Sequence, residues 1–286
     1  MTDRQIALVT GASRGIGKAT AVALAAAGFD VAVTARTLHE GEGVDDSDTG
    51  AGRAIPGSLD TTAADVERHG ARALAVRMDL LDRPTLTAGV ERVLDEWGRI
   101  DVLVNNAVHT GAGSMEHVLD LPIDVLETKL QANVVSQLVL VKAVLPHMLE
   151  RGSGTIVNMT SAVAISDPPA PAGSGGWGAG YAMTKGAFHR LAGILAVELG
   201  DRGIRAYNIE PGYVLTERME INQRALGYED VYRGAPPSVP AAVIAWLCAA
   251  PPDDADVAAC NGQTLRAQKV ALERGLHDDW RRPVRS

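Results

Sequence analysis

The chain has 286 residues, of which 46% are hydrophobic and 22% charged, a composition typical of a globular protein that buries a sizeable core. Its formal net charge is -8, and Lys and Arg form no cluster outside the last few residues, which argues against a nucleic-acid surface. The apolar run 6–10 is too short for a signal or a membrane span, and Cys248 and Cys260 have neither disulfide nor metal-ligand spacing. We therefore expect a soluble cytoplasmic protein with no metal and no membrane partner.

Short runs rich in Val, Ile and Leu alternate with helical patterns along the chain. The predicted strands are 6–10, 31–35, 73–78, 102–105, 155–159, 205–209 and a short one near 263–267. The predicted helices are 15–27, 60–69, 83–97, 124–150, 180–200 and 239–249. Apolar strands without polar alternation, separated by helices, indicate a parallel sheet covered on both faces. The predicted fold class is α/β: a single doubly wound (Rossmann) domain with a central parallel sheet of about seven strands.

We expect one catalytic domain over residues 1–267, with loop insertions at 37–59 and 166–180 and a C-terminal tail at 268–286 that is either frayed or docked on a partner. The first insertion is rich in acids and glycines. Its Asp46-Ser47-Asp48-Thr49-Gly50 run is similar to the start of a calcium loop, but Gly57 stands where the bidentate Glu is required. A mobile, solvated loop is therefore favoured over a metal site. The second insertion carries Trp177, which is either a substrate wall or a packing anchor.

Two motifs carry the chemistry. Thr10-Gly11-Ala12-Ser13-Arg14-Gly15-Ile16-Gly17 directly follows the first strand, and a glycine-rich turn into a helix is suited to a pyrophosphate. In this turn Gly11 permits the sharp exit from the strand, Gly15 lets the helix amides approach phosphates, and Gly17 lets the helix pack close to the sheet. Tyr181 and Lys185 stand four residues apart on a predicted helix, so that they project from one face.

These motifs together resemble the short-chain dehydrogenase/reductase family, and the resemblance covers roughly residues 4–265. It implies a catalytic set of Asn133, Ser161, Tyr181 and Lys185. Asn133 aligns with the family's helix Asn, whose carbonyl holds a water that passes protons to the lysine. Ser161 is preferred to its neighbour Thr160 because it is the second hydroxyl of the strand-end pair, and Tyr181 follows it after a longer gap than the family usually has.

Cofactor choice follows from charge. An NAD enzyme of this fold places a carboxylate after the second strand, whereas this chain has Arg36 there, and Arg14 lies in the glycine turn. Guanidinium groups suit a phosphate dianion, so NADP(H) is the expected cofactor. The resemblance assigns cofactor contacts to these residues: Gly11, Ser13, Arg14, Gly15, Ile16, Gly17, Arg36, Asp79, Leu80, Asn106, Ala107, Tyr181, Lys185, Pro211, Gly212, Val214 and Thr216.

The chain also departs from the family pattern after the fourth predicted strand. Val108 replaces the glycine of the family's Asn-Asn-Ala-Gly, which puts in doubt the shape of the loop beneath the nicotinamide, because a β-branched residue narrows the permitted backbone. His109 follows and is a candidate substrate contact, although a lone His at a strand end is more often incidental. The rest of the expected substrate pocket is drawn from 162–180, Tyr213 and 217–235.

The expected function is hydride transfer between NADP(H) and a carbonyl or secondary alcohol, with the tyrosine as acid and base. The alternative is a non-catalytic NADP(H)-binding regulatory protein on the same fold, which would have lost part of the catalytic set, yet none of it is lost. The substrate is not identifiable from the sequence. A homodimer or homotetramer is expected because the helices 124–150 and 180–200 carry more apolar surface than one sheet face covers. On the first of them the apolar residues are Leu138, Leu140, Val141, Val144, Leu145 and Met148.

Overall fold

The computed structural model describes residues 4–47, 52–226, 234–251 and 253–281. Its strands form one parallel sheet in the order β3-β2-β1-β4-β5-β6-β7, with the bounds β1 Ile6–Thr10, β2 Asp30–Ala35, β3 Ala73–Arg77, β4 Val102–Asn105, β5 Gly154–Met159, β6 Ile204–Glu210 and β7 Thr264–Arg266. The chain moves outward from β1 on both sides, which confirms the doubly wound α/β fold. The order reverses between β1 and β4, the position where ligands bind in such sheets.

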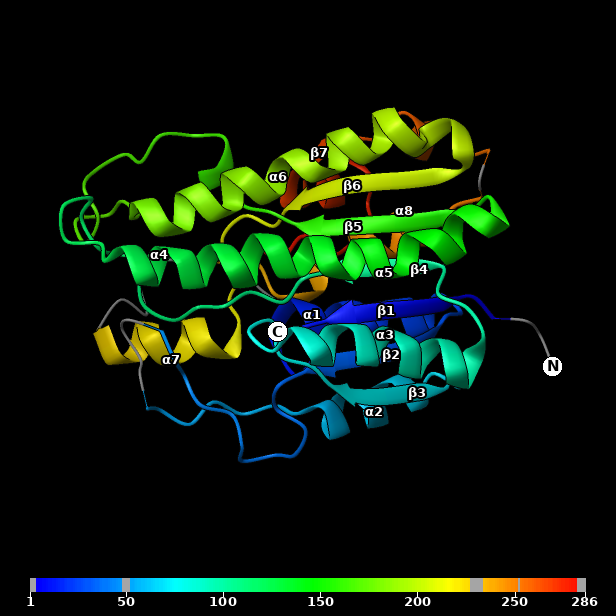
Figure 1. The fold of residues 1–286 in the computed structure, drawn as a ribbon, viewed down its shortest axis with the longest axis horizontal. Coiled ribbons are helices and arrows are strands. Elements are labelled where there is room, and N and C mark those ends of the chain that lie inside the picture. The colour runs from blue at the N-terminus through cyan, green and yellow to red at the C-terminus, as the bar shows by residue number, and fades with distance from the viewer. Residues whose placement is uncertain (1–3, 48–51, 227–233, 252, 282–286) are drawn as a thin grey trace.

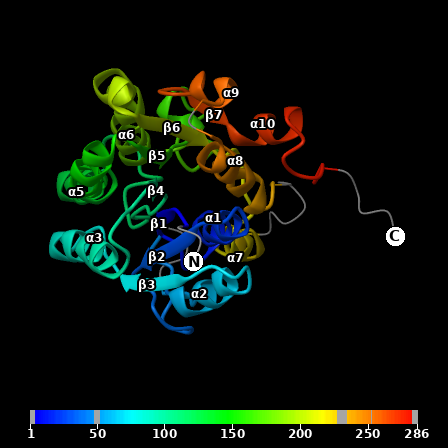
Figure 2. The same cartoon turned by 90° about the vertical axis from the view of Figure 1, so that its right-hand side faces the viewer.

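Helices cover both faces of the sheet, as Figure 2 shows with the sheet seen nearly end-on. One face carries α1 (Gly15–Ala26), α2 (Leu59–Glu67), α8 (Ser238–Ala249) and α10 (Ala267–Glu273). The other carries α3 (Arg83–Trp97), α5 (Ser136–Arg151) and α6 (Ala179–Leu199). Short α9 (Ala255–Ala258) precedes β7, and α7 (Glu217–Leu226) follows β6 at the end of the molecule drawn on the left in Figure 1. Each face has its own buried apolar cluster.

The predicted helix 124–150 is helical throughout, but a π turn interrupts it. α4 (Ile123–Leu130) passes into the π turn Gln131–Val135 and then into α5. The side chains of Leu140, Val141, Val144 and Met148 are fully buried in the core against the sheet. Helix 123–151 is the one described helix with the length and hydropathy of a membrane span, and these side chains give it a core-helix role in this fold.

The insertion 37–59 differs from the solvated loop expected of it. Val44 and Ala54 form an antiparallel bridge, and Asp45 N–H donates to Arg53 O at 2.8 Å, so the two arms of the insertion pair with each other. Ile55 and Asp45 are buried. The run that is similar to a calcium loop, residues 46–50, includes residues outside the described ranges. The expectation that it binds no metal therefore stays a prediction.

Residues 268–281, the described part of the predicted C-terminal tail, pack against the rest of the domain. α10 packs on α8, and Ala271 is fully buried. The guanidinium of Arg274 lies over the ring of Trp246 at 4.4 Å, a cation–π contact. Leu276 and Trp280 pack against the same core cluster. This segment therefore packs on its own domain as far as residue 281.

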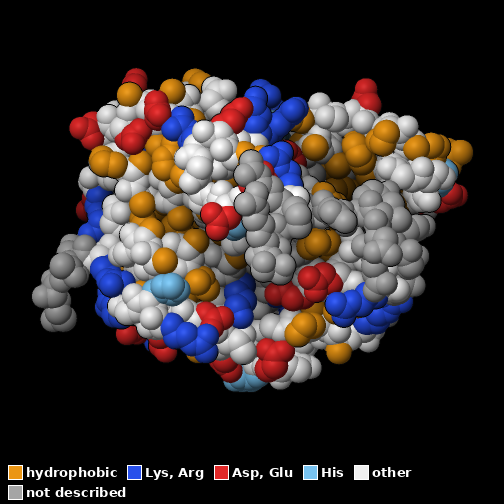
Figure 3. Space-filling model, turned by 180° about the vertical axis from the view of Figure 1, so that it is seen from behind, with side chains coloured by type: hydrophobic (Ala, Val, Ile, Leu, Met, Phe, Trp, Pro, Cys, Tyr) orange, Lys and Arg blue, Asp and Glu red, His pale blue; other side chains and the backbone are white. Residues whose placement is uncertain are grey.

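Seen from behind, the surface mixes both signs of charge, and hydrophobic side chains gather toward its upper right (Figure 3). This end of the molecule holds the loops that follow β4 and β5. Exposed apolar residues in those loops include Met115, Val118, Leu119 and Ile165. They lie at the same sheet end as the cavity described below.

Close backbone approach at the start of α1 requires its glycines. A Cβ on Gly17 would lie 2.2 Å from Gly11 O and 2.5 Å from Asn106 Nδ2, distances that no real Cβ atom adopts. Gly11 has φ +66°, and a Cβ there would lie 2.8 Å from Ala107 Cα. The turn is thus packed directly against the loop after β4, and no side chain fits between them.

We predict that Gly17→Ala lowers the free energy of unfolding by about 1–3 kcal/mol, because the methyl group must displace backbone rather than a flexible side chain. Thermal and urea unfolding measure this. Gly193→Ala is the matched control: it lies inside α6, and its Cβ would make an ordinary 3.9 Å contact with Gly262 O. This control is expected to leave stability unchanged or slightly raised. Equal stability of Gly17→Ala and the wild type would contradict the packing argument.

Candidate active site

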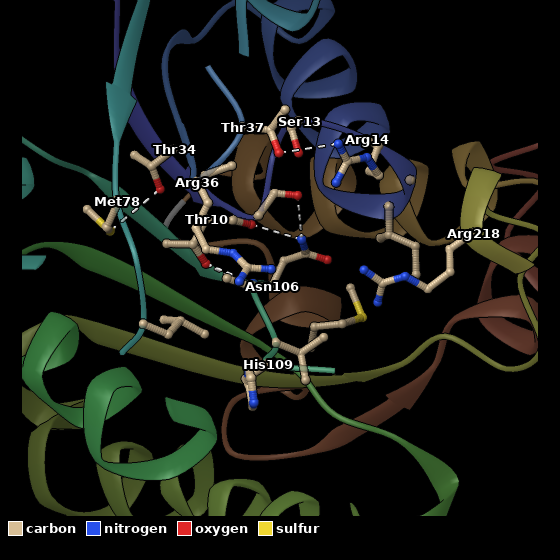
Figure 4. A pocket seen from close by; sticks show the side chains of 18 of the residues that line it. Thr10, Ser13, Arg14, Thr34, Arg36, Thr37, Met78, Asn106, His109 and Arg218 are labelled. Carbon is tan, nitrogen blue, oxygen red and sulfur yellow. Dashed lines mark hydrogen bonds between the residues drawn. The ribbon is translucent and has the colours of Figure 1, made fainter. Parts of the chain in front are cut away.

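A cavity of about 740 Å³ opens at the carboxyl ends of the strands (Figure 4). Its walls come from the glycine turn, the ends of β2, β3 and β4, helix α6, and the segment after β6. The predicted site residues that line it are Gly11, Ser13, Arg14, Gly15, Ile16, Arg36, Asp79, Leu80, Asn106, Ala107, Tyr181, Lys185, Pro211 and Thr216. The structure thus brings together residues predicted from widely separated parts of the sequence.

The glycine turn is braced by the end of β4. Asn106 donates from Nδ2 to Thr10 O at 2.8 Å and to Gly11 O at 3.2 Å. In return, Thr10 Oγ1 accepts the N–H groups of Asn106 and Ala107, each at 3.0 Å. These bonds satisfy polar groups that would otherwise be left unpaired near the cavity floor. Asn106 therefore holds the shape of the turn as well as lining the site.

Four arginines of the described chain line the cavity, two more than predicted: Arg14, Arg36, Arg77 and Arg218. Figure 4 shows Arg14, Arg36 and Arg218 around one space. Arg14 donates to Pro56 O and Gly57 O, both at 2.9 Å, so it also ties the insertion to the turn. Burial lowers the pKa of Arg14, and the nearby Arg218 adds to that lowering. The cavity thus concentrates positive charge, as an anionic ligand requires.

Three carboxylates accompany these cations: Glu42, Asp46 and Asp79. Asp46 forms an ion pair with Arg36 at 2.8 Å and accepts a hydrogen bond from Thr110 Oγ1 at 2.7 Å. Burial raises the pKa of Asp46, but the bonds from Thr110 and Arg36 outweigh it, and the net pKa lies below its usual value. Asp46 is therefore an anion inside the cavity.

Tyr181 and Lys185 both line the cavity on its α6 side. Burial raises the pKa of Tyr181, a hydrogen bond with Ser161 opposes that shift, and the nearby Glu210 adds to it. Lys185 Nζ donates to Met159 O at 2.8 Å, and burial lowers its pKa to about 8. The lysine is thus bound to the end of β5, and the group that favours the phenolate of Tyr181 in this structure is Ser161.

The two hydroxyls after β5 have different partners. Thr160 Oγ1 lies 3.0 Å from His189 Nδ1, and His189 Nε2 lies 3.2 Å from Thr264 Oγ1. Thr160 is buried and lines the cavity, whereas Ser161 forms a hydrogen bond with Tyr181. Of the two hydroxyls, Thr160 is the one among the cavity-lining residues, and Ser161 is the one in contact with Tyr181.

Asn133 lies in the π turn behind the cavity wall and does not line the cavity. Its Oδ1 accepts the N–H of His109 at 2.7 Å, and its Nδ2 donates to His109 O at 3.2 Å. π turns frequently mark functional positions within helices. Through these two bonds the side chain of Asn133 fixes the backbone of the loop after β4.

The loop after β4 accommodates Val108 without strain. No non-glycine residue in the described ranges has a positive φ, so the β-branched side chain meets no backbone penalty. Val108 and His109 both line the cavity. Burial lowers the pKa of His109, an effect that Asp46 opposes, so the imidazole is biased toward its neutral form.

Other predicted residues shape the site from outside the cavity. Gly17 lies beneath the turn, Gly212 has φ +71° and donates to Glu210 Oε1 at 2.7 Å, and buried Val214 pairs with Ala235. Trp177, from the second insertion, is not a cavity-lining residue.

The charged cavity residues that the sequence did not point to are Arg77 at the end of β3 and the acids of the first insertion. Glu42, Val44 and Asp46 line the cavity from the insertion, and Arg218 from α7. Arg218 lies in the segment 217–235, which belongs to the substrate pocket expected from the sequence, although the sequence does not single out this residue. The acids of the insertion carried no sequence signal, since only tertiary structure brings them to the cavity.

Comparison with known proteins identifies the family. Residues 5–226 match the short chain dehydrogenase family. L-rhamnose 1-dehydrogenase (NAD(P)(+)) from Sphingomonas sp. (strain SKA58) is 33% identical over 217 residues, which are 76% of this chain and 75% of that protein.

Solved structures of similar proteins indicate the same family. A metagenomic short-chain oxidoreductase in complex with NADP is 25% identical with a TM-score of 0.68, over 92% of this chain and 96% of that one. The 3-oxoacyl-[acyl-carrier protein] reductase from Brucella melitensis in complex with NAD is 26% identical with a TM-score of 0.73, over 94% and 98%. This chain is therefore a member of the short-chain dehydrogenase family of oxidoreductases.

Proposed function

We propose that the protein transfers hydride between NADP(H) and a carbonyl or secondary alcohol substrate, with Tyr181 as the acid and base. The observation that supports this most directly is the content of one cavity: the glycine turn and four arginines line part of it, and Tyr181 and Lys185 line another. A dinucleotide that extends through the cavity would meet cations with its phosphates and the tyrosine with its reactive end.

The residues present fit a phosphorylated dinucleotide. The N-terminus of α1 is a favourable place for an anion, and in this structure its Gly15 N–H donates to a carboxylate oxygen of Glu217 at 2.9 Å. Arg36 follows β2, where an adenosine ribose is expected, and Arg14 and Arg77 line the same cavity. Guanidinium groups bind phosphate oxygens by charge-assisted hydrogen bonds, which favours NADP(H) over NAD(H).

When bound, the nicotinamide supplies or accepts the hydride. Tyr181 keeps its proton at neutral pH because burial raises its pKa, so it is ready to give that proton to a substrate oxygen. Ser161 donates a hydrogen bond to the same oxygen and stabilises the negative charge that develops there. Lys185, with a pKa of about 8, is mostly charged at pH 7 and holds positive charge beside the site. Asn133 belongs to the proposed set as the residue whose backbone carbonyl orders a proton-carrying water.

The substrate class follows from this chemistry. The related L-rhamnose and 3-oxoacyl enzymes act, by their names, on molecules with a hydroxyl or keto group. We propose a small carbonyl or alcohol bound beside Val108 and His109, and we propose that the enzyme works in the cytoplasm.

Tyr181→Phe is expected to lower kcat by at least 100-fold and to leave the Kd of NADPH within about twofold, because it removes the proton donor and no phosphate contact. Absorbance at the nicotinamide band with a panel of ketones measures turnover, and fluorescence titration measures binding. The matched control is Tyr207→Phe, which removes a buried hydroxyl of β6 outside the cavity. Turnover of Tyr181→Phe within a few-fold of the wild type would show that another group donates the proton. Absence of turnover by the wild type with every ketone tested would favour the alternative, a non-catalytic dinucleotide-binding regulator.

NADPH is expected to bind more than tenfold more tightly than NADH, since one charge-assisted contact is worth about 1.5–3 kcal/mol. Arg36→Gln should remove most of that preference by weakening NADPH alone. Isothermal titration with both cofactors measures it, with Arg68→Gln on exposed α2 surface as the control for lost positive charge. Equal affinities of the wild type for the two cofactors would contradict the NADP(H) assignment.

We propose that the enzyme is a homodimer or homotetramer that pairs through α5 and α6. Val135, Leu138, Met183, Ile194 and Val197 are exposed on or beside these helices, and the exposed fraction of Val197 reaches 88%. Figure 1 shows α5 and α6 together on the side facing the viewer. Exposed apolar residues along adjacent helices are typical of an interface between subunits.

Light scattering at micromolar concentration is expected to give a multiple of the 30.0 kDa chain mass. Val197→Glu should lower the measured mass without unfolding the chain, because its side chain lies at the surface. A wild-type mass near that of one chain would refute the oligomer.

A further inference from the structure

We propose that Asp46, in the 37–59 insertion, reduces the preference for NADP(H) by competing with its 2′-phosphate for Arg36. This inference rests on the proposed NADP(H) function and deepens it. It concerns a residue that lies outside every motif of the family, and it makes the insertion part of the cofactor site.

The fold holds the insertion against the cavity. Arg14 donates to Pro56 O and Gly57 O, Ile55 N–H donates to Gly43 O at 2.9 Å, and Glu40 accepts the N–H of Gly57 at 2.8 Å. A Cβ at Gly43 would lie 2.3 Å from both Arg14 Nη2 and Ile55 O, so the two arms of the insertion pack tightly around the arginine. The position of the acidic pair that follows Gly43 is thereby determined from several directions.

Two consecutive acids in this insertion have separate roles. Asp45 is fully buried, and its carboxylate lies 3.3 Å from Arg218 Nε. Its pairing with α7 anchors the insertion across the cavity mouth. Asp46 is the cavity-lining member of the pair, and it contacts the end of β2 through Arg36 and the loop after β4 through Thr110. Its carboxylate also lies 3.9 Å from Arg218 Nη2, a longer contact than the 2.8 Å to Arg36.

This contact has an unequal effect on the two cofactors. The guanidinium that would bind the 2′-phosphate is partly neutralised by Asp46, and the phosphate must displace the carboxylate or share the cation with it. NADH carries a hydroxyl at that position and gains little from Arg36 in either case. The carboxylate therefore weakens NADPH binding selectively, and the preference measured for the wild type is smaller than Arg36 alone would give.

The test is a cycle of four proteins: wild type, Asp46→Asn, Arg36→Gln and the double variant, each titrated with NADPH and NADH. Asp46→Asn is expected to lower the Kd of NADPH at least fivefold and to change the Kd of NADH less than twofold. In the Arg36→Gln background, the same substitution should leave the Kd of NADPH unchanged. Two fragment probes test the same point. Adenosine 2′-phosphate should bind more tightly to Asp46→Asn than to the wild type, as NADPH does, whereas adenosine 5′-phosphate should bind equally to both proteins. Glu67→Gln, an exposed residue of α2, controls for lost negative charge.

The outcomes separate the two proposals. If wild-type NADPH binds more tightly than NADH but Asp46→Asn leaves both unchanged, weakens NADPH or tightens both equally, the role of Asp46 is overturned and the NADP(H) assignment stands. If NADH binds as tightly as NADPH in the wild type and in Asp46→Asn, the NADP(H) assignment itself fails. Thermal unfolding of each variant without cofactor confirms that the asparagine, which is nearly isosteric with aspartate, leaves the fold intact.

Discussion

The site depends on one close packing interaction: the glycine turn after β1 lies directly on the loop after β4. Asn106 spans the gap and bonds to the carbonyls of Thr10 and Gly11, and the absence of a side chain at Gly17 lets α1 start within contact of that amide. Because β1 and β4 are the strands at which the sheet order reverses, this contact closes the floor of the cavity. The phosphate end and the tyrosine end of the site are both positioned relative to this floor.

Charge balance is the second constraint on the cavity. Its arginines give it positive charge, but like charges held together repel: burial lowers the pKa of Arg14 most, and repulsion from Arg218 lowers it further. Asp45 and Asp46 offset part of it, the first as a fully buried partner of Arg218 and the second in contact with Arg36. These ion pairs reduce the net positive charge of the cavity.

Burial acts in opposite senses on the two α6 residues at the reactive end. It raises the pKa of Tyr181 and lowers that of Lys185, because a low-dielectric surrounding disfavours the charged form of each. Ser161 counters the effect at the phenol through a hydrogen bond. The order of the two hydroxyls after β5 matters for this reason: Thr160 is bound to His189, and its neighbour is the one that reaches the tyrosine.

The sequence by itself determined the α/β class, the strands to within a residue or two, and the two motifs, because apolar periodicity and glycine spacing are local properties of the chain. It did not reveal the π turn at 131–135, since an α-helical and a π-helical turn share the same apolar pattern. It also left the segment 268–281 undecided, because the packing of α10 on α8 depends on a surface formed by distant residues. Only the tertiary structure placed Asp46 in the cavity and paired Asp45 with Arg218, because an ion pair between positions more than 170 residues apart leaves no pattern in either local sequence.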